Sequence, residues 1–398
     1  MINAEDIKKI LKGISSELFT HFTYLHQHPE LSLKEYHTTE YIKNILLSLG
    51  LEIQPMDCAT GVVGILHGTS QGKEKCVALR ADIDGLPIAE TGSCETPSLY
   101  ENISHTCGHD CHIACLLGAA MVLSKYKDQI PGTIKFIFQP GEEGAGGAAL
   151  FAQKGCMENP KVDAIFGLHN APTVNSGYLG LKTGGIMAAV HKFKITLTGK
   201  GGHGAIPESN IDGIVAASAI IQGLQTITSR NVPPTDASVV SICSIHAGEG
   251  LTFNVNPQTV EMAGTCRCYS KKMEHLIETR FREIVTNIAA AYQVQADIEY
   301  TILHSAVLND KSLHNCAVTS ASLLGIPYVS PIPSTAGDDF STFSDYAPSY
   351  FFWLGNYNEE KDTIHPLHSP KFKIDTDTLS LGAGIYAMSA IQYLTGDY

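Results

Sequence analysis

Apolar residues recur at helical spacing at the start of the chain. Ile10, Ile14 and Leu18 repeat at the interval of one helix face, and a second pattern of the same kind runs through residues 41–49. Gly50 ends the second pattern. The first fifty residues therefore predict two amphipathic helices.

Short apolar runs then alternate with helical patterns. Strands are predicted at 75–80, 133–140 and 163–169, and a helix is predicted at 113–126. Continuous apolar runs of this length are typical of strands that are buried on both faces. This order favours helices packed on a mostly parallel central sheet, an α/β fold.

The pattern changes near residue 190 and returns after about residue 303. Four strands and two helices are predicted in between, in the order β-α-β-β-α-β, at 191–199, 212–227, 237–248, 259–269, 272–292 and 294–302. This order is that of a ferredoxin-like α+β unit. A strand at 350–356 and a closing helix at 378–394 resume the first pattern. We therefore expect a discontinuous domain of residues 1–186 and 303–398, interrupted by a smaller inserted domain at 187–302.

Composition and charge narrow the class of protein. Hydrophobic residues make up 44% and charged residues 17% of the 398 residues, which is typical of a globular chain. The net charge of −13 argues against a nucleic-acid partner. No apolar run approaches the ~20 residues of a membrane span, and the polar start "MINAEDIKKILKG" differs from a secretory signal. We expect a cytoplasmic protein that acts on a small molecule and does not bind a membrane.

Eleven cysteines occur at spacings that form no repeating framework. An odd number without a framework favours reduced thiols over disulfides. Most of these cysteines, including Cys243 within "VVSICSI", are predicted to be small core residues.

Polar side chains gather where the predicted strands end. In open α/β sheets, ligands bind at the carboxyl ends of the strands. The candidates are Asp82 and Asp84 in "LRADIDGLP", the histidines and cysteines of "HTCGHDCH" (105–112), Glu142 and Glu143 in "FQPGEEG", His169 in "FGLHN", and His365 and His368 in "HPLHSP".

Each of these motifs alone is a weak signal. A single histidine is more often structural, and paired acids are more often solvated. The segment 105–112 lacks the paired halves of a zinc finger and contains no Cys-x-x-Cys redox motif. These groups can instead meet at the strand ends of one sheet, which favours a site for two metal ions. Such a site needs shared ligands and a carboxylate that is free to accept a proton from water. The adjacent Glu142 and Glu143 suit that division between base and ligand.

The segment "GKGGHGAIP" contains glycines around His203. It lacks the ending of a phosphate-binding loop and the pattern of a dinucleotide site. The glycines favour a tight turn that presents His203, and a structural role for this histidine remains open.

Eight ordered motifs together resemble a known family. They are "LRADIDGLPI", "HTCGHDCH", "FQPGEEGAGGA", "FGLHN", "GKGGHGAIP", "FNVNP", "GTCRCY" and "GDDFSTF". Their order and spacing are similar to the amidohydrolase branch of the aminoacylase and carboxypeptidase G metallopeptidases. That branch includes hippuricases, N-acyl-amino-acid amidohydrolases and plant hydrolases of indole-acetic-acid conjugates. The resemblance extends from about residue 20 to the end of the chain.

The resemblance implies a two-metal catalytic domain and a lid domain that forms a homodimer. Cys107 would bridge the two ions as a thiolate, and Glu142 would be the general base. Asp84 would orient a ligand histidine. The remaining ligands would be His109, Glu143, His169 and His368.

The lid would supply substrate contacts. The resemblance implies that His203 stabilises the oxyanion, in its own site or in that of the partner subunit. Asn254 and Arg267 match positions that hold the α-carboxylate of the substrate. Cys111 departs from the family pattern, because glycine is usual there, and Asp338 stands where glutamate is commoner.

The implied reaction is hydrolysis of the amide bond of an N-acyl amino acid by metal-activated water, without a covalent enzyme intermediate. Manganese is the first expectation for the two divalent ions, and zinc, cobalt and nickel are alternatives. An exopeptidase or dipeptidase, or an N-acetyl-diaminopimelate deacetylase, would differ only in its pockets. A catalytically inactive metal-binding protein is the alternative from another class, and the presence of Glu142 and His203 argues against it.

Overall fold

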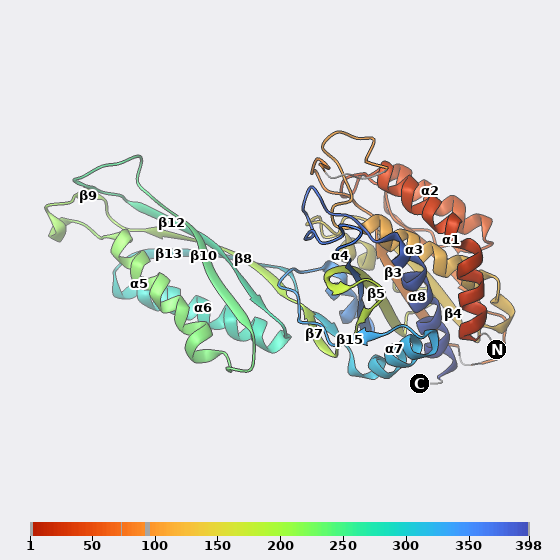
Figure 1. Cartoon of the computed structure of the whole chain (residues 1–398). Helices are drawn as coiled ribbons and strands as arrows, with labels where there is room; N and C mark the ends of the chain where they lie inside the picture. The colour runs from red at the N-terminus through yellow and green to blue at the C-terminus, as the bar shows by residue number, and fades with distance from the viewer. Residues whose placement is uncertain (1–2, 73, 92–95, 397–398) are drawn as a thin grey trace. The chain divides into compact units, whose positions relative to one another are not determined.

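The computed structural model describes residues 3–72, 74–91 and 96–396 (Figure 1). Its chain forms two compact units. The first contains the residues up to Gly184, Leu308–Ile332 and the residues from Asp339 onward, and the second contains Gly185–Val307 and Pro333–Asp338. The short strands β7 (Gly184–Met187) and β14 (Val307–Asn309) lie at the boundary. The sequence did not indicate that Pro333–Asp338 belongs to the second unit.

An eight-stranded sheet forms the centre of the first unit. The strands β4, β3, β5 and β16 are parallel neighbours, whereas β2 pairs antiparallel with both β1 and β4. The predicted mostly parallel sheet is confirmed: its central strands are parallel, and antiparallel pairs occur only towards the two sides, at β1–β2–β4 and at β16–β6. In spatial order the strands are β1 (Glu52–Ile53), β2 (Val62–His67), β4 (Thr133–Gln139), β3 (Cys76–Asp82), β5 (Ala164–Asn175), β16 (Ser349–Tyr357), β6 (Leu179–Gly180) and β15 (Tyr328–Val329).

Helices pack on this sheet around a helix that is buried on every side. Every residue of α3 up to Leu123 is buried, and its neighbours in the core are α1 and α8. A capping box of Asn3 and Asp6 begins α1. No helix in the described ranges is long and apolar enough to cross a membrane. The helices are α1 (Ala4–Gln27), α2 (Tyr36–Ser48), α3 (His109–Ser124), η1 (Lys127–Gln129), α4 (Gly147–Gln153), α7 (Lys311–Leu324), η4 (Asp339–Asp345), η5 (Thr376–Thr378) and α8 (Leu379–Thr395).

The second unit is a four-stranded antiparallel sheet in the order β10-β12-β8-β13. Helices α5 and α6 pack against each other and cover one face of this sheet (Figure 1). The β-α-β-β-α-β order of elements is the predicted one. Its elements are β8 (Ala189–Thr198), β9 (Gly202–His203), η2 (Pro207–Ser209), α5 (Gly213–Thr226), η3 (Ile227–Asn231), β10 (Ser238–Ala247), β11 (Val255–Asn256), β12 (Thr259–Cys268), α6 (Lys271–Ala291) and β13 (Gln295–His304).

The cysteines are mostly core residues, as predicted, but Cys243 is not. Eight of the ten cysteines in the described part of the chain are buried, whereas Cys243 is exposed and Cys58 is half-buried. Cys243 lies on β10, an edge strand, where the pairing register with β12 shifts between Ile242 and Ser244. Such a bulge re-aims side chains, so the apolar run alone did not predict the outcome. Cys94 lies outside the described residues.

Candidate metal centre

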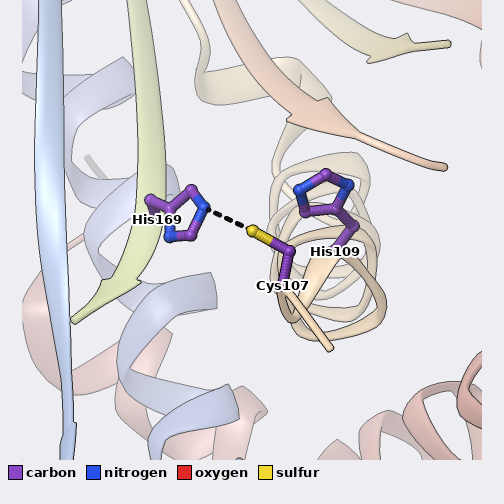
Figure 2. A group of neighbouring side chains, drawn as sticks. All are labelled: Cys107, His109 and His169. Atoms are coloured by element: carbon purple, nitrogen blue, oxygen red, sulfur yellow. Dashed lines mark hydrogen bonds between the residues drawn. The ribbon is translucent and has the colours of Figure 1, made fainter. Parts of the chain in front are cut away.

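Cys107 and His109 stand at the start of α3 and face His169 on β5. Figure 2 shows the thiol of Cys107 directed at His169, with a distance of 3.4 Å between Sγ and Nε2. Gly108, between Cys107 and His109 in the chain, has a φ of +85°, and a Cβ there would lie 2.0 Å from the side chain of Asn170. Only glycine fits this position, because both the backbone and the space exclude a side chain. The turn therefore brings the thiol and two imidazoles together.

Glu143 adds a carboxylate from the turn that follows β4. Its Oε1 lies 3.9 Å from Nε2 of His109 and 3.2 Å from Nε2 of His368. His368 lies in the loop after β16, and its backbone N–H donates to the carbonyl of Thr106, 2.8 Å away. The structure thus brings all five predicted ligands into overlapping groups whose ligand atoms lie within 4.8 Å of one another.

Two buried polar atoms in this cluster test whether metal ions fit. Nε2 of His109 and Oε1 of Glu143 are buried and make no hydrogen bond within the residues that the structure describes, although Oε1 lies 3.2 Å from the ring of His368. Buried polar atoms normally have partners, and a cation would satisfy both. A thiol, imidazoles and a carboxylate are also the donor types that divalent transition metals prefer. His365 does not join the cluster, since its ring pairs with Asp362 at 3.5 Å.

Asp84 contacts two of the candidate ligands. Its Oδ1 lies 3.2 Å from Nδ1 of His109, and its Oδ2 accepts hydrogen bonds from the hydroxyl of Ser32 (2.6 Å) and the N–H of Glu143 (3.0 Å). Burial alone would raise the pKa of Asp84, but these partners, with His109 foremost, lower it. A carboxylate at Nδ1 leaves Nε2 of His109 for a metal. This is the geometry that the predicted orienting role requires.

Asp82 and His112 form a second contact beside the cluster, and sequence reasoning did not assign His112. The Oδ1 of Asp82 lies 2.5 Å from Nδ1 of His112, and Nε2 of His112 accepts the N–H of Asn170 at 3.1 Å. Nδ1 of His112 is therefore the donor to Asp82. Oδ2 of Asp82 lies 3.7 Å from Nε2 of His109. The spacing of His109 and His112 on one helix face was the signal that could have identified this pair.

Burial and neighbouring charges shift the pKa values of the cluster. Burial raises the pKa of the Cys107 thiol well above its usual value, and the charge of Glu143 adds to the effect. Burial lowers the pKa of His169, and the nearby His112 lowers it further. Burial also opposes the charged form of His109, but Asp82 and Cys107 outweigh it and raise the pKa. A divalent cation would offset the cost of ionising the buried thiol of Cys107, because a cysteine binds metal as the thiolate.

The three predicted substrate residues lie in the second unit. His203 is on β9 and exposed, and its Nδ1 accepts the N–H of Ala205 at 3.1 Å. Asn254 is exposed just before β11. Arg267 on β12 is half-buried and donates to the carbonyls of Cys266 (2.9 Å) and Thr335 (3.2 Å). The backbone N–H of Gly204, next to His203, donates to the carbonyl of Asn254 at 2.8 Å, and the roles of all three residues stay predictions.

A buried thiol, imidazole and carboxylate cluster beside the inner strands β4 and β5 of an α/β sheet suits a metal-dependent hydrolase. The chain belongs to Peptidase family M20/M25/M40, whose model matches residues 78–392. This result confirms the resemblance drawn from the motifs. The protein is accordingly a metal-dependent hydrolase of a metallopeptidase family.

Three relatives illustrate the family. The chain is 38% identical over 374 residues to an N-acetyl-L-cysteine deacetylase of Bacillus subtilis, covering 94% of this chain and 86% of the relative. It is 36% identical over 376 residues to the IAA-amino acid hydrolase ILR1-like 2 of Arabidopsis thaliana, covering 93% and 83% of the two chains. The crystal structure of the YXEP protein of Bacillus subtilis, a dinuclear metal-binding peptidase of the M20 family, superposes with a TM-score of 0.85 at 34% identity, covering 96% and 99% of the chains.

Proposed function

We propose that this enzyme hydrolyses the amide bond of N-acyl amino acids and releases a carboxylic acid and a free amino acid. Two relatives support the substrate class by name, one as a deacetylase of an N-acetyl amino acid and one as a hydrolase of an amino-acid conjugate. In both names an amino acid carries an acyl group. An amide of this kind is a small molecule, and the net charge of −13 argues against nucleic acid.

The position of Glu142 carries the proposal. A carboxylate oxygen of Glu142 lies within 4.8 Å of the ligand atoms of His109 and Glu143, and the side chain is only 8% exposed. Its Oε1 accepts the backbone N–H of Asp339 at 3.3 Å. Glu142 thus lies beside the cluster to which its neighbour Glu143 contributes a candidate ligand. A general base must lie within reach of the water whose proton it takes.

The metal ions would be held by Cys107 as a shared ligand and by the four partners His109, Glu143, His169 and His368. Two divalent ions there would lower the pKa of a water molecule to about 7 and polarise the amide carbonyl. Glu142 takes the proton of the attacking water and delivers it to the leaving amine. No side chain becomes acylated. Manganese is our first choice, ahead of zinc, cobalt and nickel, since one thiolate among imidazole and carboxylate ligands suits any of these ions.

The inserted unit supplies substrate contacts and a dimer interface in this proposal. His203 would stabilise the oxyanion, and Asn254 and Arg267 would bind the α-carboxylate, for which a guanidinium is suited. Exposed apolar side chains support a homodimer through this unit, including Leu251 (84% exposed) and Phe253 (92% exposed). A cytoplasmic location remains our prediction from the sequence.

Amine release from a panel of substrates tests the function. N-acetyl and N-benzoyl amino acids and dipeptides would be incubated with the purified chain and added manganese or zinc, and free amine would be measured with ninhydrin. We expect release from acyl amino acids by the wild type and almost none by Glu142→Gln. A preference for dipeptides would instead establish the exopeptidase alternative, for which the peptidase name of the YXEP protein is a reason.

A further inference from the structure

A buried charged array joins the proposed base to a proposed ligand. We propose that Arg80 and Asp339 are positioning residues that hold Glu142 and His109 in place together, through Asp82. This inference rests on the proposed function of Glu142. Asp339 and Arg80 lie 259 positions apart in the sequence and meet in the first unit.

Arg80 is the centre of the array. Its side chain is fully buried on β3. Its Nε donates to Oε1 of Gln139 (2.7 Å), Nη1 donates to Oδ2 of Asp82 (2.8 Å), and Nη2 donates to Oδ1 of Asp339 (3.0 Å). The planar guanidinium fixes the angles between these three partners, which a lysine could not do. Arg80 therefore sets the separation and orientation of two carboxylates.

Asp339 connects Arg80 to the base. Its Oδ2 accepts the N–H of Ala148 at 2.8 Å, and both of its carboxylate oxygens accept from Nε2 of Gln139 at 2.8–2.9 Å. Gln139 and Ala148 flank the turn that carries Glu142. The backbone N–H of Asp339 also donates to Oε1 of Glu142 at 3.3 Å. One residue thus holds both ends of the turn and contacts the base carboxylate.

Asp82 connects Arg80 to the ligand side. Its Oδ2, which accepts from Arg80, also lies 3.7 Å from Nε2 of His109. A shift of Arg80 would therefore move the groups at Glu142 and at His109 together. Separate structural roles would leave these two effects independent.

Lys135 offers a matched control. It is a fully buried cation on the neighbouring strand β4, and Nζ donates to Oε1 of Gln54 (2.9 Å) and to the carbonyl of Cys156 (3.2 Å). None of these partners belongs to the proposed centre. Loss of Lys135 removes a buried cation without touching Glu142 or His109.

The test compares Asp339→Asn, Arg80→Lys and Lys135→Met in the full chain. Steady-state kinetics with the best acyl amino acid would be measured at saturating metal, with melting temperature alongside. The metal-free proteins would be titrated with Co²⁺ and followed by visible absorption. We expect Asp339→Asn and Arg80→Lys to lower kcat and Co²⁺ affinity by about 10–100-fold, the range for groups that orient metal ligands, with KM little changed. Lys135→Met should lower the melting temperature and leave kcat and Co²⁺ affinity nearly unchanged.

A double-mutant cycle completes the test. Asp339→Asn and Asp82→Asn combined should cost much less in kcat than the product of the two single losses, because both break one array. Multiplicative losses, or an Asp339→Asn protein that matches Lys135→Met in all readouts, would overturn the proposal. If the wild type hydrolysed no acyl amino acid, the proposed function would fail, while the Co²⁺ titration would still decide whether the array positions the ligands.

Discussion

The two sets of predicted site residues are held in different ways. In the first unit, Cys107, His109 and His169 are buried and contact one another or side chains from other elements. In the second unit, His203 and Asn254 are exposed, and the hydrogen bonds of His203 stay within its own turn and the following loop. A buried group held from several sides is preorganised before a ligand arrives. An exposed group acquires its role only when it contacts a ligand or a second chain.

The largest effect is expected at the base. Glu142→Gln keeps the size of the side chain but cannot accept a proton, so kcat should fall by about 10³-fold, within the range for a general base. Bound metal, counted by mass spectrometry after dialysis, should stay at the wild-type value. Glu143→Gln is the matched variant one position away, and it should lose metal instead. Metal loss in Glu142→Gln would reverse the assigned roles of the pair.

Cys107→Ala removes the atom predicted to be shared by both ions. Because one thiolate would serve both, we expect affinity for the two ions to fall together, and turnover to fall about 100-fold or more at limiting metal. Calorimetric titration of the metal-free protein would show this loss. Selective weakening of one ion would contradict the bridging role.

The exposed residues should respond differently. His203→Ala should lower kcat by about 100-fold, the lower range for removal of an oxyanion donor, with metal content and melting temperature unchanged. Arg267→Ala should mainly raise KM, since it removes a partner of the substrate carboxylate. Steady-state kinetics of both variants, together with their bound metal per chain, would check these two expectations. Unaltered rates would show that His203 has a structural role and does not take part in catalysis.

His368 is the exception in the first unit, because its side chain is 51% exposed. Asp375 stabilises the loop that carries His368. Its carboxylate accepts hydrogen bonds from Ser176 (2.6 Å), Asn358 (3.0 Å) and Lys361 (2.6 Å). Burial opposes the charged form of Asp375, but these partners hold its pKa below 3.8. A carboxyl with a lowered folded pKa contributes stability that is present above 3.8 and lost as pH falls through the folded value.

The smallest effect is therefore expected for Asp375→Asn. This variant should be less stable than the wild type by about 1–3 kcal/mol at neutral pH, the cost of losing hydrogen bonds to a charged group. Denaturant unfolding at a series of pH values would measure the difference, which should shrink below pH 3.8. A difference that stays constant with pH would show that the charge of Asp375 plays no part.

Sequence patterns predicted the ligand cluster better than its supports. Cys107, His109 and His169 stand in motifs that made them candidates, although His169 lies within β5, which continues to Asn175 beyond the predicted strand end at 169, and the other two stand at the start of α3. Arg80 and Asp339 also stand in quoted motifs, "LRADIDGLPI" and "GDDFSTF", but sequence reasoning gave them no role, because an ion pair between distant segments leaves no periodic trace in the sequence. The exposure of Cys243 was missed because an edge strand with a bulge has the same apolar run as a buried one.

The two-metal claim is tested most directly by adding metal back to the metal-free protein. Bound Mn²⁺ per chain and hydrolysis of the best acyl amino acid would be measured together at each step of the titration. We expect no activity without metal and two ions per chain at full activity. Full activity in the metal-free protein, or full activity with only one ion per chain, would contradict the two-metal claim.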